Sequence, residues 1–192
     1  DKSYEKIKNG PDINRQVTFS KDFKSAFSIG SNAQSPKALY QIDFRKKEMN
    51  VIDDPSKVIL DKKNFGDIED WVFVNTNGDS IDGRYYLPPL FDPGKKYPLI
   101  VYYYGGTVPV GRSFAGRYPY NWYASQGYVV YVLQPRGCTG YGQKFSATHV
   151  NNWGKTTAED IIEGTQKFSI AHSFVDTSAI ACIGASYGGF MT

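Results

Sequence analysis

The sequence contains little cysteine: Cys138 and Cys182 are the two among 192 residues. Small domains that depend on disulfides carry more cysteines at regular spacings, so this composition argues against a disulfide framework. Cys138 lies in a glycine-containing loop and Cys182 in an apolar run. We therefore predict two small buried thiols that are not bonded to each other.

Histidine is equally scarce, with only His149 and His172 in the chain. Neither has cysteine or glutamate near it at the spacing of a zinc site, so the sequence predicts no metal site. Both are interpreted as loop histidines that face solvent or form a hydrogen bond.

The sequence also lacks charge blocks and long apolar runs. Its net charge of +3 comes from scattered residues, which argues against a nucleic-acid or membrane-surface partner. No apolar run approaches the roughly 20 residues of a membrane span. A composition of 41% hydrophobic and 21% charged residues is typical of a soluble globular protein. The start at Asp1, with neither methionine nor a signal sequence, suggests a cut chain or a mature product, and leaves cytoplasmic and periplasmic locations open.

The character of the chain changes near residue 65. Before it, Tyr40, Ile42 and Phe44 alternate with polar residues, which is typical of a half-buried antiparallel strand. Residues 1–65 offer about four short strands, close to one blade of a β-propeller. One blade cannot bury its own faces. We predict that residues 1–65 are the end of a propeller and that a second domain spans 66–192.

The second domain is predicted to be α/β. An antiparallel pair opens it, and three apolar runs follow that are typical of parallel strands covered on both faces. The pair is Trp71–Val74 with Arg84–Leu87, and the runs are Leu99–Tyr104, Tyr128–Leu133 and Ala179–Ile183. A helix is predicted over Thr156–Phe168, with Thr156 and Glu159 as its capping box, and a weaker one near Tyr118–Gln126. This order is that of the first half of an α/β-hydrolase sheet.

The last apolar run leads into Gly184-Ala185-Ser186-Tyr187-Gly188. A G-x-S-x-G turn between a strand and a helix is the nucleophile elbow of a serine hydrolase, whose glycines make room for a tight turn. In this architecture the acid and the histidine of the catalytic triad follow the serine, but only six residues follow Ser186, and both histidines precede it. We therefore expect the nucleophile in this chain and the triad Asp and His beyond Thr192.

Four motifs in order carry a resemblance to a known family. They are Lys96 to Gly106 (KYPLIVYYYGG), Arg136 to Gly142 (RGCTGYG), Asn152-Trp153-Gly154 ahead of Glu159-Asp160, and Gly184 to Thr192 (GASYGGFMT). Together they resemble the prolyl oligopeptidase-type serine peptidases, in particular the dipeptidyl-peptidase and acylaminoacyl-peptidase branches. The resemblance covers nearly the whole chain, because in that family a β-propeller precedes the peptidase domain.

The resemblance implies roles for single residues. Ser186 would be the nucleophile, and the Tyr104 hydroxyl and the Tyr187 backbone N–H would form the oxyanion hole. The Tyr187 ring would also line the specificity pocket. An alternative interpretation of Tyr104 is a packed aromatic residue at a strand end. The family needs no cofactor; its implied partners are a peptide substrate and the missing C-terminal part of the catalytic domain, and a homodimer is left open.

Arg136 is a second candidate for substrate binding, since it follows a parallel strand at the edge where such sites form. A structural ion pair with Glu159 or Asp160 is the stronger interpretation. Trp153 is interpreted as part of a packed turn before a helix, and Asp176 as a turn residue at the opposite end of the sheet.

Three hypotheses about function follow. The first is a serine peptidase that cleaves short peptides near the N-terminus or after proline. The second keeps the same fold and site but acts on carboxylic esters. The third is that residues 1–192 alone form a catalytically incomplete fragment with a structural or interaction role, which predicts exposed apolar surface.

Overall fold

A computed structural model describes residues 4–192 of the chain. Contacts divide the chain into two units, Asp1–Asn64 with Arg112–Pro119 and Phe65–Gly111 with Tyr120–Thr192. The break after Asn64 lies beside the change of character noted in the sequence, whereas no sequence pattern separates 112–119 from its neighbours. In the described part of the chain, no helix is both long and apolar enough to cross a membrane.

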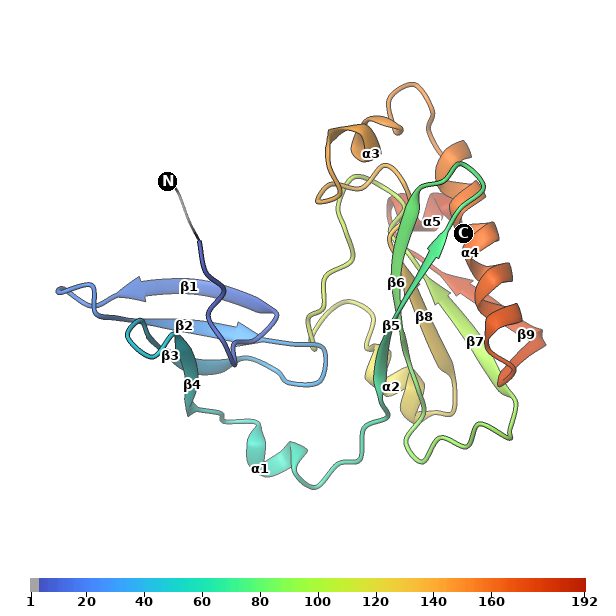
Figure 1. Ribbon diagram of the computed structural model, residues 1–192. Coiled ribbons are helices and arrows are strands. Elements are labelled where there is room, and N and C mark those ends of the chain that lie inside the picture. The colour runs from blue at the N-terminus through green and yellow to red at the C-terminus, as the bar shows by residue number, and fades with distance from the viewer. Residues whose placement is uncertain (1–3) are drawn as a thin grey trace. The chain divides into compact units, whose positions relative to one another are not determined.

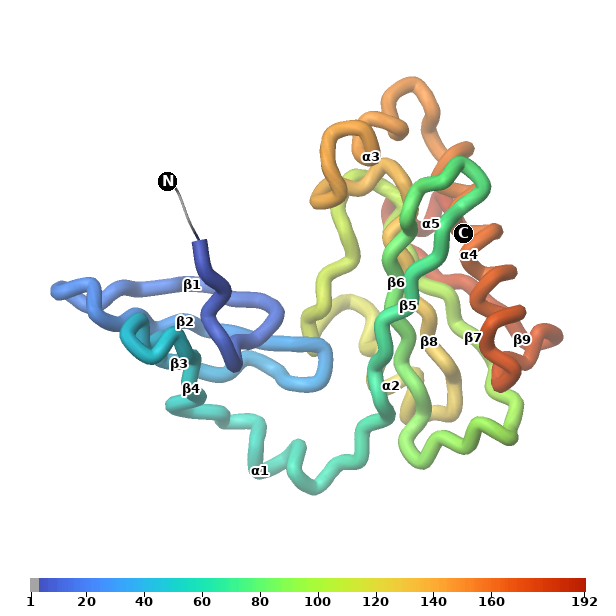
Figure 2. The backbone as a smooth tube through the Cα atoms, viewed as in Figure 1, coloured from blue at the N-terminus to red at the C-terminus, as the bar shows by residue number. Residues whose placement is uncertain are grey.

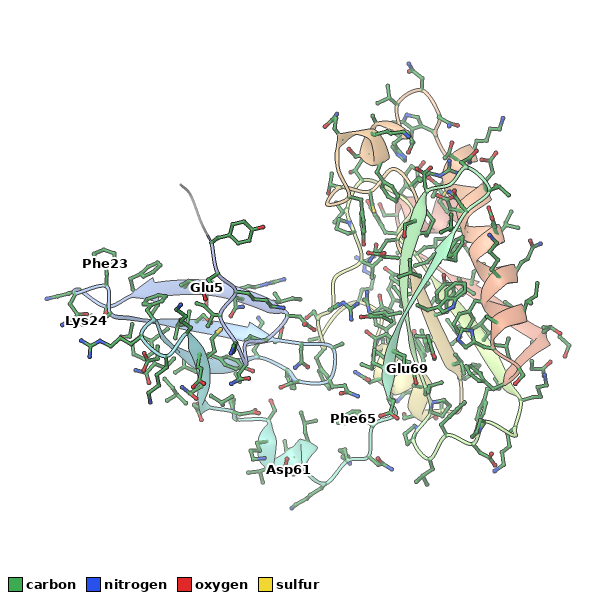
Figure 3. All side chains as sticks on the ribbon, in the orientation of Figure 1. Glu5, Phe23, Lys24, Asp61, Phe65 and Glu69 are labelled. Carbon is green, nitrogen blue, oxygen red and sulfur yellow. The ribbon has the colours of Figure 1, made fainter. Side chains whose placement is uncertain are left out.

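The first unit contains a four-stranded antiparallel sheet in the order β1-β2-β3-β4. Its strands are β1 (Ile13–Phe19), β2 (Ser25–Ser31), β3 (Ala38–Asp43) and β4 (Glu48–Asp53), and the short helix α1 (Lys57–Leu60) follows. On β3, Tyr40 and Ile42 are buried while Leu39 and Gln41 face out, as the alternation predicts. Phe23, in the turn between β1 and β2, is largely exposed (Figure 3). The small core therefore lies on one face of this sheet only.

The second unit contains a five-stranded mixed sheet in the order β5-β6-β8-β7-β9. Its strands are β5 (Ile68–Val74), β6 (Ser80–Tyr86), β7 (Tyr97–Tyr102), β8 (Val129–Leu133) and β9 (Val175–Ile183). β5, β6 and β8 pair antiparallel, and β7 pairs parallel with both β8 and β9. Figure 2 traces the chain through these strands. The predicted antiparallel pair and the three parallel strands are all present.

Helices connect the parallel strands: α2 (Tyr120–Ser125) lies between β7 and β8, and α3 (Gln143–Ala147) and α4 (Lys155–Ala171) lie between β8 and β9. The short α5 (Tyr187–Met191) follows β9. The predicted capping box of α4 is wrong. The helix begins after Gly154, which has a φ of 82° and no side chain to cap with, so Thr156 lies inside the first turn. There its hydroxyl contacts the side-chain amide of Asn152 instead.

The two faces of the mixed sheet are covered differently (Figure 1). On one face Tyr131 of β8 stacks on Phe168 of α4, with ring centroids 4.4 Å apart, and both side chains are fully buried. On the other face Tyr86 of β6 packs against Tyr120 of α2 at 5.2 Å. Neighbouring residues of a strand point to opposite faces, so the apolar runs supply side chains to both layers.

Strand β9 departs from the prediction that all three parallel strands are covered on both faces. Every residue of β8 is buried, whereas most of β9 is exposed or half-buried. The reason is position: β8 lies between β6 and β7, while β9 is an edge strand that pairs with β7 alone. An apolar groove lined by Ile161 and Ile162 of α4 and by Ile180 and Cys182 of β9 is open beside it. Exposed apolar surface is therefore present in the described chain, as the incomplete-fragment hypothesis predicts.

Candidate active site

The parallel pairing of β7 with β9 brings two candidate residues to the same edge of the sheet. In this register Tyr102 lies opposite Ile183. Tyr104 and Ser186 follow these partners by a few residues, so both lie just beyond the carboxyl ends of their strands. Ligands of open α/β sheets bind at this edge.

The turn at Ser186 has the strained geometry of a nucleophile elbow. Ser186 has φ 56° and ψ −126°, a region that residues with a Cβ rarely adopt, and its side chain is exposed. A Cβ on Gly184 would lie 2.1 Å from the Gly188 carbonyl oxygen, and one on Gly188 would lie 3.0 Å from the Tyr103 carbonyl oxygen. A Cβ on Gly189 would meet nothing closer than 3.6 Å. Backbone oxygens thus leave no room for a side chain at Gly184 and little at Gly188, whereas Gly189 has room for one.

Tyr187 is the first residue of α5, so its backbone N–H has no carbonyl partner within that helix. The N–H is therefore available to an anion that forms beside Ser186. The Tyr187 ring lies 6.3 Å from the ring of Tyr104 and 5.4 Å from that of Phe190. Its hydroxyl is buried and has no hydrogen-bond partner within residues 4–192. A buried hydroxyl without a partner is costly, and such groups concentrate where a ligand or a further group completes the site.

Tyr104 lies in the loop that follows β7, and the two glycines after it are constrained. Gly105 has a φ of 74°, and a Cβ on it would be 3.0 Å from the side chain of Met191 in α5. A Cβ on Gly106 would lie 2.7 Å from the ring of Tyr104. These close approaches hold the Tyr104 backbone against the elbow helix.

His149 and Trp153 lie closer to the elbow than the sequence indicates. The His149 ring is 5.2 Å from the Tyr187 ring and 5.5 Å from that of Trp153. The His149 Nδ1 atom is buried and has no hydrogen-bond partner in the described part of the chain, while the residue as a whole is half-buried. The prediction of a solvent-facing or hydrogen-bonded loop histidine therefore does not hold for this nitrogen. The Trp153 ring is 71% exposed, so the predicted packed turn is wrong as well.

A positional signal for these two residues exists in the sequence. The segment between α3 and α4 follows β8, and connections that follow a parallel strand pass the same edge as the elbow. The same position after β8 that predicts the place of Arg136 also applies to His149 and Trp153.

No histidine described in the structure is hydrogen-bonded to the Ser186 hydroxyl. His172 is the C-cap of α4, and its Nδ1 lies 2.9 Å from the Phe168 carbonyl oxygen. Its ring packs against Tyr85 and Trp71 in the core. His172 is therefore a hydrogen-bonded loop residue, as predicted. Within residues 4–192, no cluster of His, Cys, Asp and Glu has the arrangement of a metal site.

Arg136 lies in the turn after β8 and forms the predicted ion pair. Its Nε lies 2.9 Å, and its Nη2 2.8 Å, from oxygens of the Asp160 carboxylate, which is fully buried. Asp160 also accepts hydrogen bonds from the Arg136 backbone N–H and from the Asn75 side chain, both at 2.8 Å. Burial acts to lower the pKa of Arg136, but the hydrogen bonds and charges of Asp160, Asp79 and Glu159 raise it overall. Substrate binding by Arg136 stays a prediction. In this structure its guanidinium forms ion pairs with the carboxylates of Asp160, Asp79 and Glu159.

The structure also tests the predictions for the two cysteines and for Asp176. Cys138 is buried, and burial raises the pKa of its thiol to about 11. Cys182 is exposed on the edge strand, so the prediction of a buried thiol is wrong for it. Both thiols are free, as predicted. Asp176 is the second residue of β9, so the prediction of a turn residue before this strand is wrong. Its carboxylate accepts hydrogen bonds from the backbone N–H and the hydroxyl of Ser178.

Comparison with known proteins adds to this geometry. Residues 114–192, which include Arg136 and the elbow, match the family model described as the prolyl oligopeptidase family. The Arg136 turn and the elbow thus lie in the part of the chain that is similar to this family. A probable dipeptidyl-peptidase 5 of Aspergillus terreus is 37% identical over 120 residues, which are 62% of this chain and 17% of the relative. The dipeptidyl-peptidase 5 of Schizosaccharomyces pombe is 36% identical over 122 residues, or 62% of this chain and 18% of the relative.

Solved structures of the prolyl oligopeptidase family extend the similarity to nearly the whole chain. An acylaminoacyl peptidase of Pyrococcus horikoshii is 26% identical, with a TM-score of 0.80 over 92% of this chain and 28% of its own. The chain thus spans less than a third of the relatives that it matches. The fold is α/β: an antiparallel segment that resembles a propeller blade, followed by the sheet, helices and elbow of the N-terminal half of an α/β-hydrolase domain.

Proposed function

We propose that this chain is part of a serine peptidase that cleaves short peptides through an acyl-enzyme on Ser186. The observation that carries the proposal is the strained, exposed serine at the elbow. The residue after it, Tyr187, begins α5, and its ring lies 6.3 Å from that of Tyr104. The match of residues 114–192 to the prolyl oligopeptidase family model supports a peptidase, and relatives named dipeptidyl-peptidase and acylaminoacyl peptidase favour short peptides that are cleaved near their N-terminus.

In the proposed mechanism the Ser186 hydroxyl attacks the scissile carbonyl carbon, and a histidine outside residues 1–192 takes its proton. The carbonyl oxygen becomes an oxyanion that accepts hydrogen bonds from the Tyr187 N–H and the Tyr104 hydroxyl. Collapse of this intermediate breaks the C–N bond, and the histidine returns the proton to the leaving amine. Water then hydrolyses the ester on Ser186 by the same steps. The triad aspartate, also outside residues 1–192, orients the histidine, and the Tyr187 ring contacts the substrate.

The test is Ser186→Ala in the complete peptidase, assayed with dipeptidyl and N-acetyl-aminoacyl p-nitroanilides. We expect hydrolysis to fall by about four orders of magnitude or more, because the remaining groups cannot form an acyl-enzyme. Hydrolysis at an unchanged rate would overturn the proposal. The preferred substrate of the two classes identifies the branch.

The esterase hypothesis uses the same serine and oxyanion donors, so it requires its own assay. Matched ester and amide substrates with one acyl group separate the two functions. A peptidase hydrolyses the amide at a rate comparable to that of the ester, whereas an esterase hydrolyses the ester and not the amide.

Residues 1–192 alone are proposed to be inactive. The exposed edge strand β9 and the absence of a histidine partner for Ser186 among the described residues support this. Labelling with a fluorophosphonate tests it: the complete peptidase is labelled at Ser186, and residues 1–192 are not.

A further inference from the structure

Two buried polar side chains near the candidate oxyanion loop have no part in the proposed mechanism. Arg84 lies on β6, and Gln134 directly follows β8. The exposed fractions of these residues are only 3% and 6%. Burying an arginine and an amide is unfavourable unless their hydrogen bonds are made, so their partners indicate what they do.

Both side chains bind the backbone of one short segment, Val110 and Gly111. The Gln134 Oε1 accepts a hydrogen bond from the Val110 N–H at 2.9 Å, and its Nε2 donates to the Val110 carbonyl at 2.7 Å. The Arg84 Nη2 donates to the Gly111 carbonyl at 2.6 Å, and its Nη1 lies 3.3 Å from the Val110 carbonyl. One amide and one guanidinium thus satisfy three backbone groups of a segment that belongs to no helix or strand.

The two side chains are themselves held by the sheet. The Gln134 N–H donates to the Asp82 carbonyl of β6 at 2.8 Å, and the Arg84 Nε lies 3.1 Å from the Tyr86 hydroxyl. Their positions are therefore fixed by β6 and β8 and not by the loop. We call Arg84 and Gln134 the loop clamp.

The loop between β7 and α2 spans residues 103–119, and the clamped segment ends only its first half, which begins at Tyr104. In this half, Gly105 packs closely against Met191, and Thr139 donates from its N–H and its hydroxyl to the Thr107 carbonyl at 2.9 and 3.0 Å. The backbone that carries Tyr104 is therefore restrained at residues 105, 107 and 110–111.

We propose that Arg84 and Gln134 are positioning residues for the oxyanion hole. By fixing the loop from Gly105 to Gly111 they hold the Tyr104 hydroxyl where the oxyanion forms. The inference rests on the proposed function. Positioning matters because donors contribute to catalysis only when they are fixed before the charge develops, and a shift of about 1 Å can cost about a hundredfold in rate.

The test is a double-mutant cycle in the complete peptidase. Gln134→Met keeps the volume of the side chain and removes both hydrogen bonds to Val110. We expect kcat to fall about tenfold or more with a smaller change in KM, since the oxyanion exists only in the transition state. In a Tyr104→Phe background the same substitution should change kcat less than twofold, because the group that it positions is gone.

Two further variants separate positioning from general loss of stability. Ile81→Val, also on β6 and fully buried, removes a methylene away from the loop and should leave kcat unchanged. Arg84→Lys keeps the charge but cannot reach two carbonyls as a fork, so its kcat should fall between those of the wild type and Gln134→Met. Hydrogen exchange tests the clamp without an activity assay. The backbone amides of residues 105–111 should exchange faster in Gln134→Met than in the wild type, while the exchange rates of the β8 amides should not change.

Equal losses of kcat with Tyr104 intact and in the Tyr104→Phe background would overturn the clamp, and so would unchanged exchange in the loop. Failure of the proposed function looks different. In that case Ser186→Ala remains active, while the exchange measurement still reports whether the loop is clamped.

Discussion

The turns after β8 and β9 lie at the same edge of one sheet, yet their polar groups differ in burial and in hydrogen bonding. After β8, Arg136 is buried with the Asp160 carboxylate, and each polar group of the pair has a partner at hydrogen-bond distance. After β9, Ser186 is exposed in a strained conformation, and the Tyr187 hydroxyl beside it is buried without a partner among the described residues.

This difference distinguishes a structural turn from a reactive one. Strain and unsatisfied polar groups lower stability, and they persist where the surrounding fold imposes them and a ligand or reaction uses them. The Asp160 network joins the β5–β6 hairpin, through Asn75, to α4.

Of the substitutions that test the difference between the two turns, Asp160→Asn is expected to have the largest effect, and this effect is on stability. The substitution leaves the Arg136 guanidinium buried without its main counter-charge, so the free energy of unfolding should fall by about 3–5 kcal/mol. Urea unfolding of the chain measures it. Glu159→Gln is the matched control, because its carboxylate is half exposed and 3.7 Å from Arg136. It should change stability by less than about 1 kcal/mol. Equal effects of the two variants would contradict a special role for the buried pair.

The next largest effect is expected on kcat and concerns only the turn at Ser186. Tyr104→Phe should lower kcat about 10²- to 10³-fold, which corresponds to about 3–4 kcal/mol of transition-state stabilisation, because one oxyanion donor is removed. Its unfolding midpoint in urea should not change. Tyr131→Phe is the control: its hydroxyl is buried, has no partner among the described residues and lies in the core. A normal kcat for Tyr104→Phe would assign Tyr104 to packing, the alternative that the sequence left open.

Much of this architecture could be predicted because local patterns determine it. Unbroken apolar runs identified the parallel strands, and the glycines around Ser186 identified a turn that the backbone contacts at Gly184 and Gly188 require. The ion pair of Arg136 with Asp160 followed from their order in the chain and the preference of arginine for bidentate carboxylates.

What the sequence did not reveal depends on long-range packing. Cys182 and Ile180 are apolar enough for a central strand, but the position of β9 at the edge leaves them exposed. The position of His149 after β8 indicates only the edge of the sheet at which it lies, and its ring contact with Tyr187 depends on how the segment before α4 packs. Arg84 and Gln134 lie in strand patterns where a buried charge or amide is not expected, and only the path of the loop after Tyr104 explains them.

An intermediate effect is expected from pH, through the buried turn after β8. Burial raises the pKa of Cys138 from its ordinary value of 9.0 to about 11 in the folded chain. The protonated thiol therefore favours the folded state; its contribution is fully present below pH 9 and is lost as the pH rises to about 11. At about 1.4 kcal/mol for each pKa unit, the loss is about 2–3 kcal/mol.

Urea unfolding of wild type and Cys138→Ala between about pH 8 and pH 11 measures this contribution as the difference between the two curves. Burial also raises the pKa of Tyr103 to about 12, and this group acts in both variants, so the subtraction removes its contribution. The difference includes the charge of the Cys138 thiolate on Tyr141, which adds to the raised pKa of that phenol. A constant difference between wild type and Cys138→Ala across this range would show that the Cys138 thiol does not titrate with unfolding.

The smallest effect has the opposite sign and tests the strain at the elbow directly. Ser186→Gly should raise the free energy of unfolding by about 1 kcal/mol, because relief of a conformation that costs about 1–3 kcal/mol outweighs the roughly 0.5–1 kcal/mol by which glycine favours the unfolded chain. Ser186→Ala keeps the Cβ and hence the strain, so it should lie within about 0.5 kcal/mol of the wild type. Asn151 also has a positive φ, of 55°, but asparagine tolerates that region, so Asn151→Gly should gain little. A Ser186→Gly variant less stable than Ser186→Ala would mean that the elbow is relaxed, and the contrast between the two turns would then depend on their hydrogen bonds alone.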